Sequence, residues 1–132
     1  MILCDLDRLK DINDRYGHAV GDQVLRATAD VLRERVRASD VAARLGGDEF
    51  GVLCPDTDPE SASLLAETLR RRLAELSEAD GPAPAVTISV GVAGREPHDV
   101  SPSELMLRVD DRLYRAKGTR NAVWLDDRVG AA

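Results

Sequence analysis

Residues 41–54 read VAARLGGDEFGVLC, two short apolar segments separated by paired glycines and paired acids. Paired glycines tolerate positive φ, so Gly46-Gly47-Asp48-Glu49 is predicted to be the turn of a β-hairpin. Its strands are expected over Val41–Leu45 and Phe50–Cys54. The rest of the chain is expected to supply the other strands and the helices that pack on them.

Apolar periodicity outside the hairpin predicts three more strands and four helices. The strands are expected over Met1–Leu6, Val86–Val92 and Ala122–Leu125. The first two helices are expected over Asp11–Tyr16 and Gly21–Val36. Asp58 and Pro59 are a typical N-cap and first position of a third helix, which is expected to end at Asp80-Gly81-Pro82. Ser101-Pro102-Ser103-Glu104 is a capping box that begins the fourth.

This order of elements predicts an α/β fold, an α+β sandwich in which helices flank one mainly antiparallel central sheet. The ferredoxin-like, split βαβ plan has the same order. Because typical domains contain about 100–200 residues, one domain is expected. It should extend over residues 1–127 of the 132 and be followed by a short C-terminal tail at 128–132.

Composition excludes several classes of protein. With 18 basic and 24 acidic residues the net charge is −6, which argues against sequence-independent binding to nucleic acid. No apolar run approaches the roughly 20 residues that span a bilayer, so we expect no membrane segment and a cytoplasmic protein. Cys4 and Cys54 lie outside any Cys/His cluster and are expected to be buried, reduced thiols.

Acids at the end of the first strand and in the hairpin turn are candidates for a metal site. In a ferredoxin-like sheet the first strand lies beside the central hairpin, so Asp5, Asp48 and Glu49 are expected to converge at one edge. Mg²⁺ prefers two or three such carboxylates, together with water and substrate phosphates. Gly46 and Gly47 would let their backbone approach a flat or phosphorylated ligand. The alternative is a surface turn whose acids are merely solvated.

The basic residues are unevenly chosen, since Lys10 and Lys117 are the only lysines and the others are arginines. A compact ammonium suits a phosphate contact, so both lysines are candidates for one. The alternative is that an Arg-rich composition reflects genome base content and that the two lysines have no special role.

Other polar residues are expected to have ordinary structural roles. Asp7 and Asp14 are expected to face solvent or to cap a helix. Thr87 and Ser89 lie in an apolar strand without a partner for a catalytic triad, so nucleophilic serine chemistry has no support.

Several motifs carry a family resemblance that extends over nearly the whole chain. They are Asp5–His18, Gly21-Asp22, Arg44–Phe50, Val86–Gly91 and Leu113–Lys117. In order and spacing they strongly resemble the GGDEF domain of diguanylate cyclases. The resemblance implies a fold like that of class III nucleotide cyclases, and an enzyme that condenses two GTP molecules into cyclic di-GMP with release of two pyrophosphates.

The resemblance also implies roles for individual residues. Asp5 and Asp48 look like the carboxylates that bind Mg²⁺, or Mn²⁺ in its place, and the Leu6 carbonyl looks like a further ligand. Glu49 resembles an accessory catalytic carboxylate, and Lys10 resembles a catalytic residue that contacts phosphates. Metal ions at this place would neutralise the triphosphate charge and help to activate the attacking ribose hydroxyl.

Substrate-binding residues follow from the same resemblance. Asn13 and Asp22 fall where the family recognises guanine, and a carboxylate can accept from the N1–H and N2–H₂ edge that adenine lacks. Lys117 and Arg120 fall where the family contacts phosphates. Each domain would hold one GTP, so the resemblance implies a homodimer in which two domains face each other.

Arg37-Ala38-Ser39-Asp40 stands upstream of the turn, where the family has an RxxD site that binds its product, cyclic di-GMP, and inhibits the enzyme. The pattern itself is weak, because Arg8–Asp11 and Arg108–Asp111 also satisfy it. Only the offset from Gly46 singles out Arg37. The alternative is a solvated Arg at a helix end and an Asp that caps the next turn.

Three features depart from the family pattern. Leu9 replaces an aromatic residue, a hydrophobic exchange that changes packing more than chemistry. The spacing from Lys117 to Arg120 is one residue shorter than the family's usual lysine-to-arginine spacing. The chain begins inside the first strand, without the helix that precedes it in the family. It is therefore expected to be either a piece of a longer chain that carries a sensory domain, or a variant that has lost this part of its support.

Two other functions stay open at this point. A non-catalytic module that binds GTP or cyclic di-GMP, as a sensor or an interaction domain, would use the same fold. A purely structural interaction domain would leave the convergence of Asp5, Asp48 and the two lysines unexplained.

Overall fold

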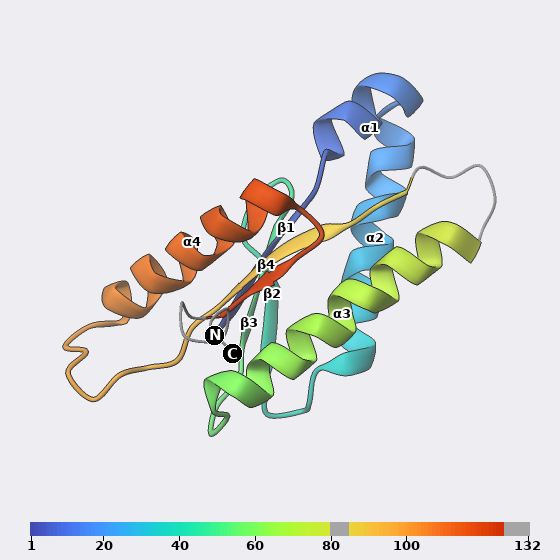
Figure 1. Cartoon of the computed structure of the whole chain (residues 1–132). Helices are drawn as coiled ribbons and strands as arrows, with labels where there is room; N and C mark the ends of the chain where they lie inside the picture. The colour runs from blue at the N-terminus through green and yellow to red at the C-terminus, as the bar shows by residue number, and fades with distance from the viewer. Residues whose placement is uncertain (80–84, 126–132) are drawn as a thin grey trace.

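The computed structural model describes residues 1–79 and 85–125 (Figure 1). Its elements follow the predicted order of strands and helices. They are β1 (Ile2–Leu6), α1 (Leu9–Tyr16), α2 (His18–Arg35), β2 (Val41–Arg44), β3 (Glu49–Leu53), α3 (Pro59–Ala79), β4 (Ile88–Val92), α4 (Pro102–Thr119) and β5 (Val123–Trp124). The predicted helix end at 80–82, the domain boundary at 127 and the tail at 128–132 lie outside the described residues.

The strands form one sheet in the order β2-β3-β1-β4-β5. β1 pairs antiparallel with β3 and with β4, β2 pairs antiparallel with β3, and β4 pairs parallel with β5. The predicted sheet is therefore confirmed as mainly antiparallel, with β1 at its centre. α2 and α3 cover one face of the sheet, and α4 covers the other (Figure 1).

All residues of β1 are buried, because helices cover both faces of this central strand. Ile2 and Leu6 belong to the larger hydrophobic cluster, under α2 and α3. Leu3 points to the opposite face, where it packs with Val109 of α4. Since the side chains of a strand alternate between faces, Asp5 lies on the α4 face as well.

The first two helices are longer than the periodicity predicts. α1 begins at Leu9 instead of Asp11, and α2 begins at His18 instead of Gly21. Gly17 is the single residue between them and has a φ of 90°. One glycine in a backbone conformation that other residues seldom adopt is enough to redirect the chain, so no longer connection is needed.

The predicted hairpin is present, but neither Gly46 nor Gly47 adopts positive φ, so that part of the prediction is wrong. Arg44 holds the turn instead, because its Nε donates to Gly46 O (3.0 Å) and its Nη2 donates to Gly47 O (2.7 Å). Leu45 N–H also donates to Glu49 O, at 2.8 Å. A guanidinium presents several donors in a fixed plane, so one side chain can orient two neighbouring carbonyls.

Cys4 and Cys54 are buried free thiols, as predicted. Burial raises the pKa of Cys4 to about 12, so this thiol stays protonated at neutral pH. Within residues 1–79 and 85–125, no helix combines the length and the apolar character needed to span a bilayer.

α4 packs directly on the backbone of β4 at Gly91. A Cβ added there would lie 2.6 Å from Val109 O and would overlap the backbone N of Leu113. The helix can therefore approach the sheet this closely only because the position carries no side chain.

Gly91→Ala should push α4 away from the sheet and lower the free energy of unfolding by about 3 kcal/mol, the upper end for overpacking, since backbone atoms cannot rotate aside. Urea denaturation followed by circular dichroism measures this loss. Gly118→Ala is the matched control, because a Cβ at that exposed position of α4 meets nothing within 4 Å. It should raise the stability by about 0.5–1 kcal/mol. Equal stabilities of the two variants would contradict the close packing at Gly91.

Candidate active site

An acid and a base meet at the end of β1. Asp5 is 6% exposed, and Lys117, in the last turn of α4, places its Nζ 2.7 Å from Asp5 Oδ2. The two residues are far apart in the sequence. α4 covers one face of the sheet (Figure 1). Asp5 lies on that face, two residues after Leu3, which packs with Val109 of α4, and this brings the two residues together.

The hairpin turn lies at the same edge of the sheet. Leu6 N–H donates to Asp48 O at 3.0 Å, and Asp5 is opposite Glu49 in the ladder between β1 and β3. The Asp48 carboxylate lies close enough to that of Asp5 to raise its pKa. The structure thus brings Asp5, Asp48 and Glu49 together at one edge.

The electrostatics of this edge are set by burial and by one ion pair. Burial raises the pKa of the Asp5 carboxyl, and the neighbouring Asp48 charge raises it further, against the hydrogen bond from Lys117. Burial alone would lower the pKa of Lys117, but the hydrogen bond and the charge of Asp5 raise it. Lys117 thus places a cation beside this buried carboxyl and opposes the rise in its pKa.

The donor set at this edge fits a divalent cation. Asp5 is a buried carboxylate whose charge calls for a cation, and Asp48 adds a second carboxylate beside it. Mg²⁺ is commonly held by one or two carboxylates and completes its shell with water and substrate phosphates. The described residues contain no group of three or more His, Cys, Asp or Glu placed to hold a metal ion. A cation at this edge would therefore need water molecules and substrate phosphates as further ligands.

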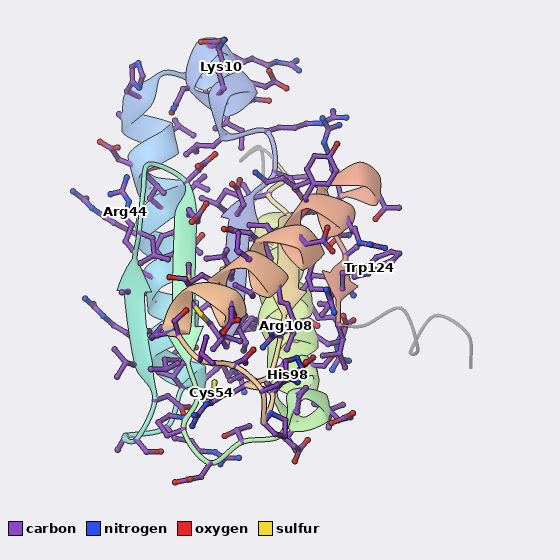
Figure 2. All side chains as sticks on the ribbon, turned by 90° about the vertical axis from the view of Figure 1, so that its left-hand side faces the viewer. Lys10, Arg44, Cys54, His98, Arg108 and Trp124 are labelled. Carbon is purple, nitrogen blue, oxygen red and sulfur yellow. The ribbon has the colours of Figure 1, made fainter. Side chains whose placement is uncertain are left out.

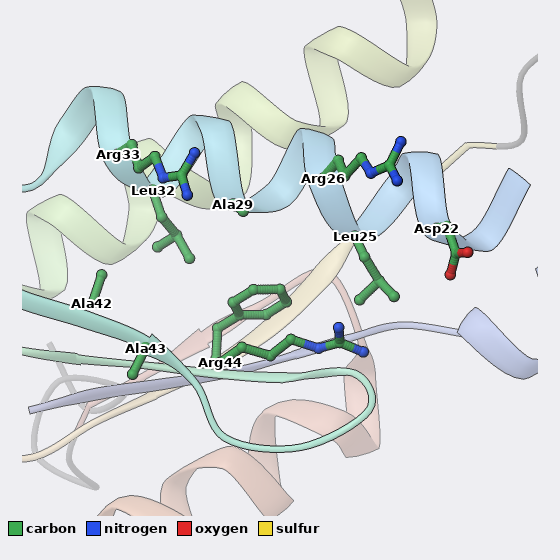
Figure 3. A pocket seen from close by; sticks show the side chains of 10 residues that line it. Asp22, Leu25, Arg26, Ala29, Leu32, Arg33, Ala42, Ala43 and Arg44 are labelled. Atoms are coloured by element: carbon green, nitrogen blue, oxygen red, sulfur yellow. The ribbon is translucent and has the colours of Figure 1, made fainter. Parts of the chain in front are cut away.

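Asn13 and Asp22 come from the neighbouring helices α1 and α2. A Cβ on Gly21 would overlap Asn13 Oδ1, so the Asn13 side chain lies against the backbone of α2 at the residue that precedes Asp22. Asp22 is exposed and lines a cavity of about 490 Å³ between α2 and the β2–β3 hairpin (Figure 3). Arg26 and Arg44 line the same cavity, so groups of both charges face it.

Lys10 and Arg120 are exposed cations, of which Lys10 follows Asp5 in the sequence and Arg120 follows Lys117. Lys10 lies on α1, at the end of the molecule drawn at the top of Figure 2. Arg120 is the residue that follows α4, with φ 59° and ψ 164°. Neither side chain forms a hydrogen bond or an ion pair with another residue that the structure describes.

Gly46 and Gly47 leave open space beside the turn. A Cβ on Gly47 would meet nothing within 4 Å, and one on Gly46 would lie 3.9 Å from Glu49 Cβ. Packing in the fold therefore does not require glycine at either position. What the two glycines provide is an uncovered backbone next to Asp48, which suits the close approach of a ligand.

The Arg37–Asp40 turn joins α2 to β2. Arg37 N–H donates to Asp40 Oδ2 (2.8 Å), and Asp40 N–H donates to Arg37 O (3.0 Å). The charges of both residues act on the pKa of the Cys54 thiol, so this turn lies near Cys54. Figure 2 shows Cys54 well away from Lys10. Asp40 therefore caps the turn, while Arg37 is exposed.

The expectation that Asp7 faces solvent or caps a helix is wrong. Asp7 is 8% exposed and accepts hydrogen bonds from Thr87 Oγ1 and Ser89 Oγ, each at 2.7 Å. It also accepts from Asn121 N–H at 2.9 Å. Two hydroxyls on one face of an apolar segment signal a buried polar partner, and this signal could have identified Asp7. No sequence pattern of this kind identifies Arg44 as the residue that holds the hairpin turn. Its hydrogen-bond partners are backbone carbonyls, which every residue carries.

Residues 1–122 match the model of the family described as diguanylate cyclase, GGDEF domain. The chain belongs to the GGDEF domain family. It is 47% identical over 124 residues to diguanylate cyclase DgcM of Escherichia coli, over 93% of the chain and 30% of that protein. It is 41% identical over 126 residues to response regulator PleD of Caulobacter vibrioides, over 92% of the chain and 28% of that protein. The GGDEF chain thus spans less than a third of the length of these relatives.

Solved GGDEF structures share the fold. The active GGEEF domain of a diguanylate cyclase from Vibrio cholerae has a TM-score of 0.88 at 32% identity, over 93% of this chain and 79% of that one. The GGDEF domain of DgcB from Caulobacter crescentus, in complex with c-di-GMP, has a TM-score of 0.87 at 33% identity, over 93% and 74%. The family resemblance and the predicted fold class are therefore confirmed.

The raised pKa of Asp5 should respond to both of its neighbours in this GGDEF domain. Asp48→Asn removes a negative charge and should lower the pKa of Asp5, whereas Lys117→Met removes the ammonium and should raise it further. NMR titration of the Asp5 carboxyl carbon measures both changes. Asp14→Asn, at an exposed position of α1, is the control and should leave the titration unchanged.

The stability of the domain should depend on pH through the same carboxyl. A folded-state pKa above the unfolded value means that protonation of Asp5 favours the fold. This contribution is complete below the unfolded pKa and is lost as the pH rises through the folded pKa. In Lys117→Met the loss should therefore continue to higher pH. An Asp5 pKa that stays fixed in both variants would contradict the observed contacts.

Proposed function

We propose that this domain is a diguanylate cyclase, which condenses two GTP molecules into cyclic di-GMP and releases two pyrophosphates. The observation that carries the proposal is the meeting of Asp5, Asp48 and Lys117 at one edge of the sheet, in a chain of the GGDEF family. Two carboxylates and an ammonium at one point suit a nucleoside triphosphate with a divalent cation. Relatives named diguanylate cyclase support the same activity.

Asp5, Asp48 and the Leu6 carbonyl would hold the cation, Mg²⁺ or Mn²⁺ in its place. When bound, it would neutralise triphosphate charge and favour ionisation of the attacking ribose hydroxyl. Glu49, opposite Asp5 in the sheet, would act as an accessory carboxylate at the same edge. Lys117 would donate hydrogen bonds to the phosphates as well as to Asp5, because an ammonium has three donors.

Further phosphate contacts would come from residues around this edge. Lys10 and Arg120 are exposed cations, and Gly46 and Gly47 offer an uncovered backbone. Lys10 would also act catalytically, by stabilising the negative charge that develops on the phosphate in the transition state. Such charge stabilisation is effective when the donors are already in place before the reaction.

Asn13 and Asp22 would recognise the guanine base. The Asp22 carboxylate can accept from guanine N1–H and N2–H₂, a pair of donors that adenine does not present. Gly21 allows Asn13 to lie beside it, because a side chain at that position would displace the amide. The cavity of about 490 Å³ that Asp22 lines gives space next to these groups.

A homodimer would complete the reaction. Each domain binds one GTP, so each ribose hydroxyl must attack the α-phosphate of the GTP in the partner. Holding two reactants in line removes about 7–11 kcal/mol of the barrier in favourable cases, so juxtaposition of two domains supplies much of the catalysis.

We also propose a cytoplasmic domain over residues 1–127 that is controlled by a sensory domain on a longer chain. Relatives of which this chain spans less than a third support that arrangement.

The purified domain should convert GTP to cyclic di-GMP when Mg²⁺ is supplied, with a specific activity that rises with protein concentration because dimerisation is required. Chromatography of the nucleotides measures the product. Asp48→Asn should lower kcat by about 100-fold or more, since it removes a charged group from the reacting centre. Asp110→Asn, an exposed carboxylate on α4, is the charge-matched control and should retain activity.

The outcomes of this assay separate the competing functions. GTP or cyclic di-GMP binding without product, at every protein concentration, would contradict the cyclase and favour a catalytically impaired binding module. The absence of both binding and product would leave a structural interaction domain.

We propose, in addition, that cyclic di-GMP inhibits the enzyme at Arg37 and Asp40. The exposed Arg37 would contact guanine and phosphate of the product, and the turn capped by Asp40 fixes the spacing of the two side chains. A charged side chain that donates hydrogen bonds to a ligand contributes about 1.5–3 kcal/mol, or about 10-fold to 100-fold in affinity.

Arg37→Ala should therefore weaken cyclic di-GMP binding by about 10-fold to 100-fold, as measured by calorimetry. Arg35→Ala, an exposed arginine two residues earlier in α2, is the matched control and should bind as the unaltered chain does. An unchanged affinity in Arg37→Ala would remove the basis for this inhibitory site.

A further inference from the structure

Asp7 follows β1 directly and ties the central strands to α4. Its Oδ1 accepts from Ser89 Oγ at 2.7 Å, and Ser89 Oγ also lies 3.5 Å from Ala116 O in α4. Asp7 N–H donates to Thr87 O at 2.9 Å, so backbone and side chain of this residue are both fixed. With 8% exposure, the carboxylate relies on protein donors in place of water.

The second oxygen of Asp7 holds the turn between α4 and β5. Oδ2 accepts from Asn121 N–H at 2.9 Å and from Thr87 Oγ1 at 2.7 Å. Asn121 is also held from another side, because its Oδ1 accepts from Arg70 Nη1 of α3 at 2.7 Å. Asp7 and Arg70, which are far from Asn121 in the sequence, thus both hold this residue of the turn.

The backbone of the same turn is strained. Arg120 has φ 59° and ψ 164°, a region that residues with a side chain seldom occupy, and Asn121 has a φ of 45°. Asn tolerates a left-handed backbone because its short side chain can bond locally, whereas Arg has no such compensation. A strained residue persists only where its surroundings determine its conformation, and the bond from Asn121 to Asp7 is part of those surroundings.

Lys117 lies in the last turn of α4, three residues before the strained position. Arg120 N–H donates to Ala116 O at 2.8 Å, so the strained turn is joined to the helix directly beside Lys117. Lys117 Nζ in turn lies 2.7 Å from Asp5. A displacement of the turn would therefore move the ammonium relative to Asp5.

We propose that Asp7 is a positioning residue that holds the strained turn at Arg120 and Asn121 and thereby sets the place of Lys117 against Asp5. The catalytic consequence rests on the proposed cyclase function, whereas the positional part concerns contacts that exist without substrate. A misplacement of about 1 Å at a catalytic site can cost about 100-fold in rate. Asp7 thus acts on the reaction through Lys117, without contact to GTP.

Hydrogen exchange in the domain without nucleotide tests the positional part. In Asp7→Ala, exchange at the Asn121 amide should accelerate by about tenfold or more, because its acceptor is gone. Thr87→Val is the matched control, since it removes one donor from the same carboxylate and leaves the Asn121 bond in place. Its Asn121 exchange should change by less than about threefold. Equal acceleration in the two variants, or none in Asp7→Ala, overturns the proposal.

Arg120→Gly provides a second test, because glycine adopts the conformation at position 120 without strain. Since this variant also removes a proposed phosphate contact, the effect of Asp7→Ala in that background is measured relative to Arg120→Gly itself. Asp7→Ala should lower kcat/KM for GTP by about 10-fold to 100-fold in the unaltered chain, with the larger part in KM, as a displaced phosphate contact requires. The loss should be several times smaller when Asp7→Ala is made in Arg120→Gly. Equal losses in both backgrounds would show that Asp7 supports the fold in general, and would overturn the proposal.

A substitute variant is available if Asp7→Ala does not fold, and the exchange experiment does not depend on cyclase activity. If Asp7→Ala does not fold, Asp7→Asn replaces it, because the amide keeps one oxygen for Asn121 N–H and should show the same pattern with smaller changes. If the unaltered chain makes no cyclic di-GMP, the proposed function fails. The exchange experiment then still decides whether Asp7 holds the turn.

Discussion

A carboxylate in a strand that helices cover on both sides stays ionised only if a cation or several donors compensate its charge. Asp5 is such a carboxylate, and Lys117 compensates it across 2.7 Å. This ion pair constrains the architecture, since α4 must cross the face to which Asp5 points and must end level with it. Gly91 permits that course, because α4 packs there against the bare backbone of β4. The candidate active site therefore depends on how α4 packs on the sheet.

The two turns that bring Asp48 and Lys117 to this edge are built on one principle. Arg44 holds the carbonyls of the hairpin turn, and Asp7 holds the amide of the turn after α4. In each case a charged side chain bonds to backbone and so orients a neighbouring residue that is proposed to meet the metal or the substrate. Rigid support of this kind lowers the rearrangement that a site needs during reaction, because the charges already point to where they act.

Much of the fold and part of the site are predictable from the sequence. Apolar periodicity and helix caps locate the elements, and the ferredoxin-like plan places Asp5 beside the hairpin turn, where the structure has it. The positions of α1 and α2 are less predictable, because Gly17 alone separates them. Positive φ at Gly46 and Gly47 is a wrong inference, since the turn is stabilised by a side chain and not by glycine conformations. Asp7 is misjudged because an acid just past a strand usually meets water.

The amino-acid sequence alone determines the order of strands and helices, the membership of the GGDEF family and the set of candidate ligands. These properties depend on local periodicity and short motifs, which neighbouring residues carry. The tertiary structure alone decides that Asp7 is buried, that Lys117 compensates Asp5, and that Arg120 occupies a strained conformation. Burial and charge compensation arise from contacts such as those of Asp7 with Thr87 and Asn121, which are 80 and 114 positions away. A local pattern cannot encode them, because they exist only after helices and strands have packed.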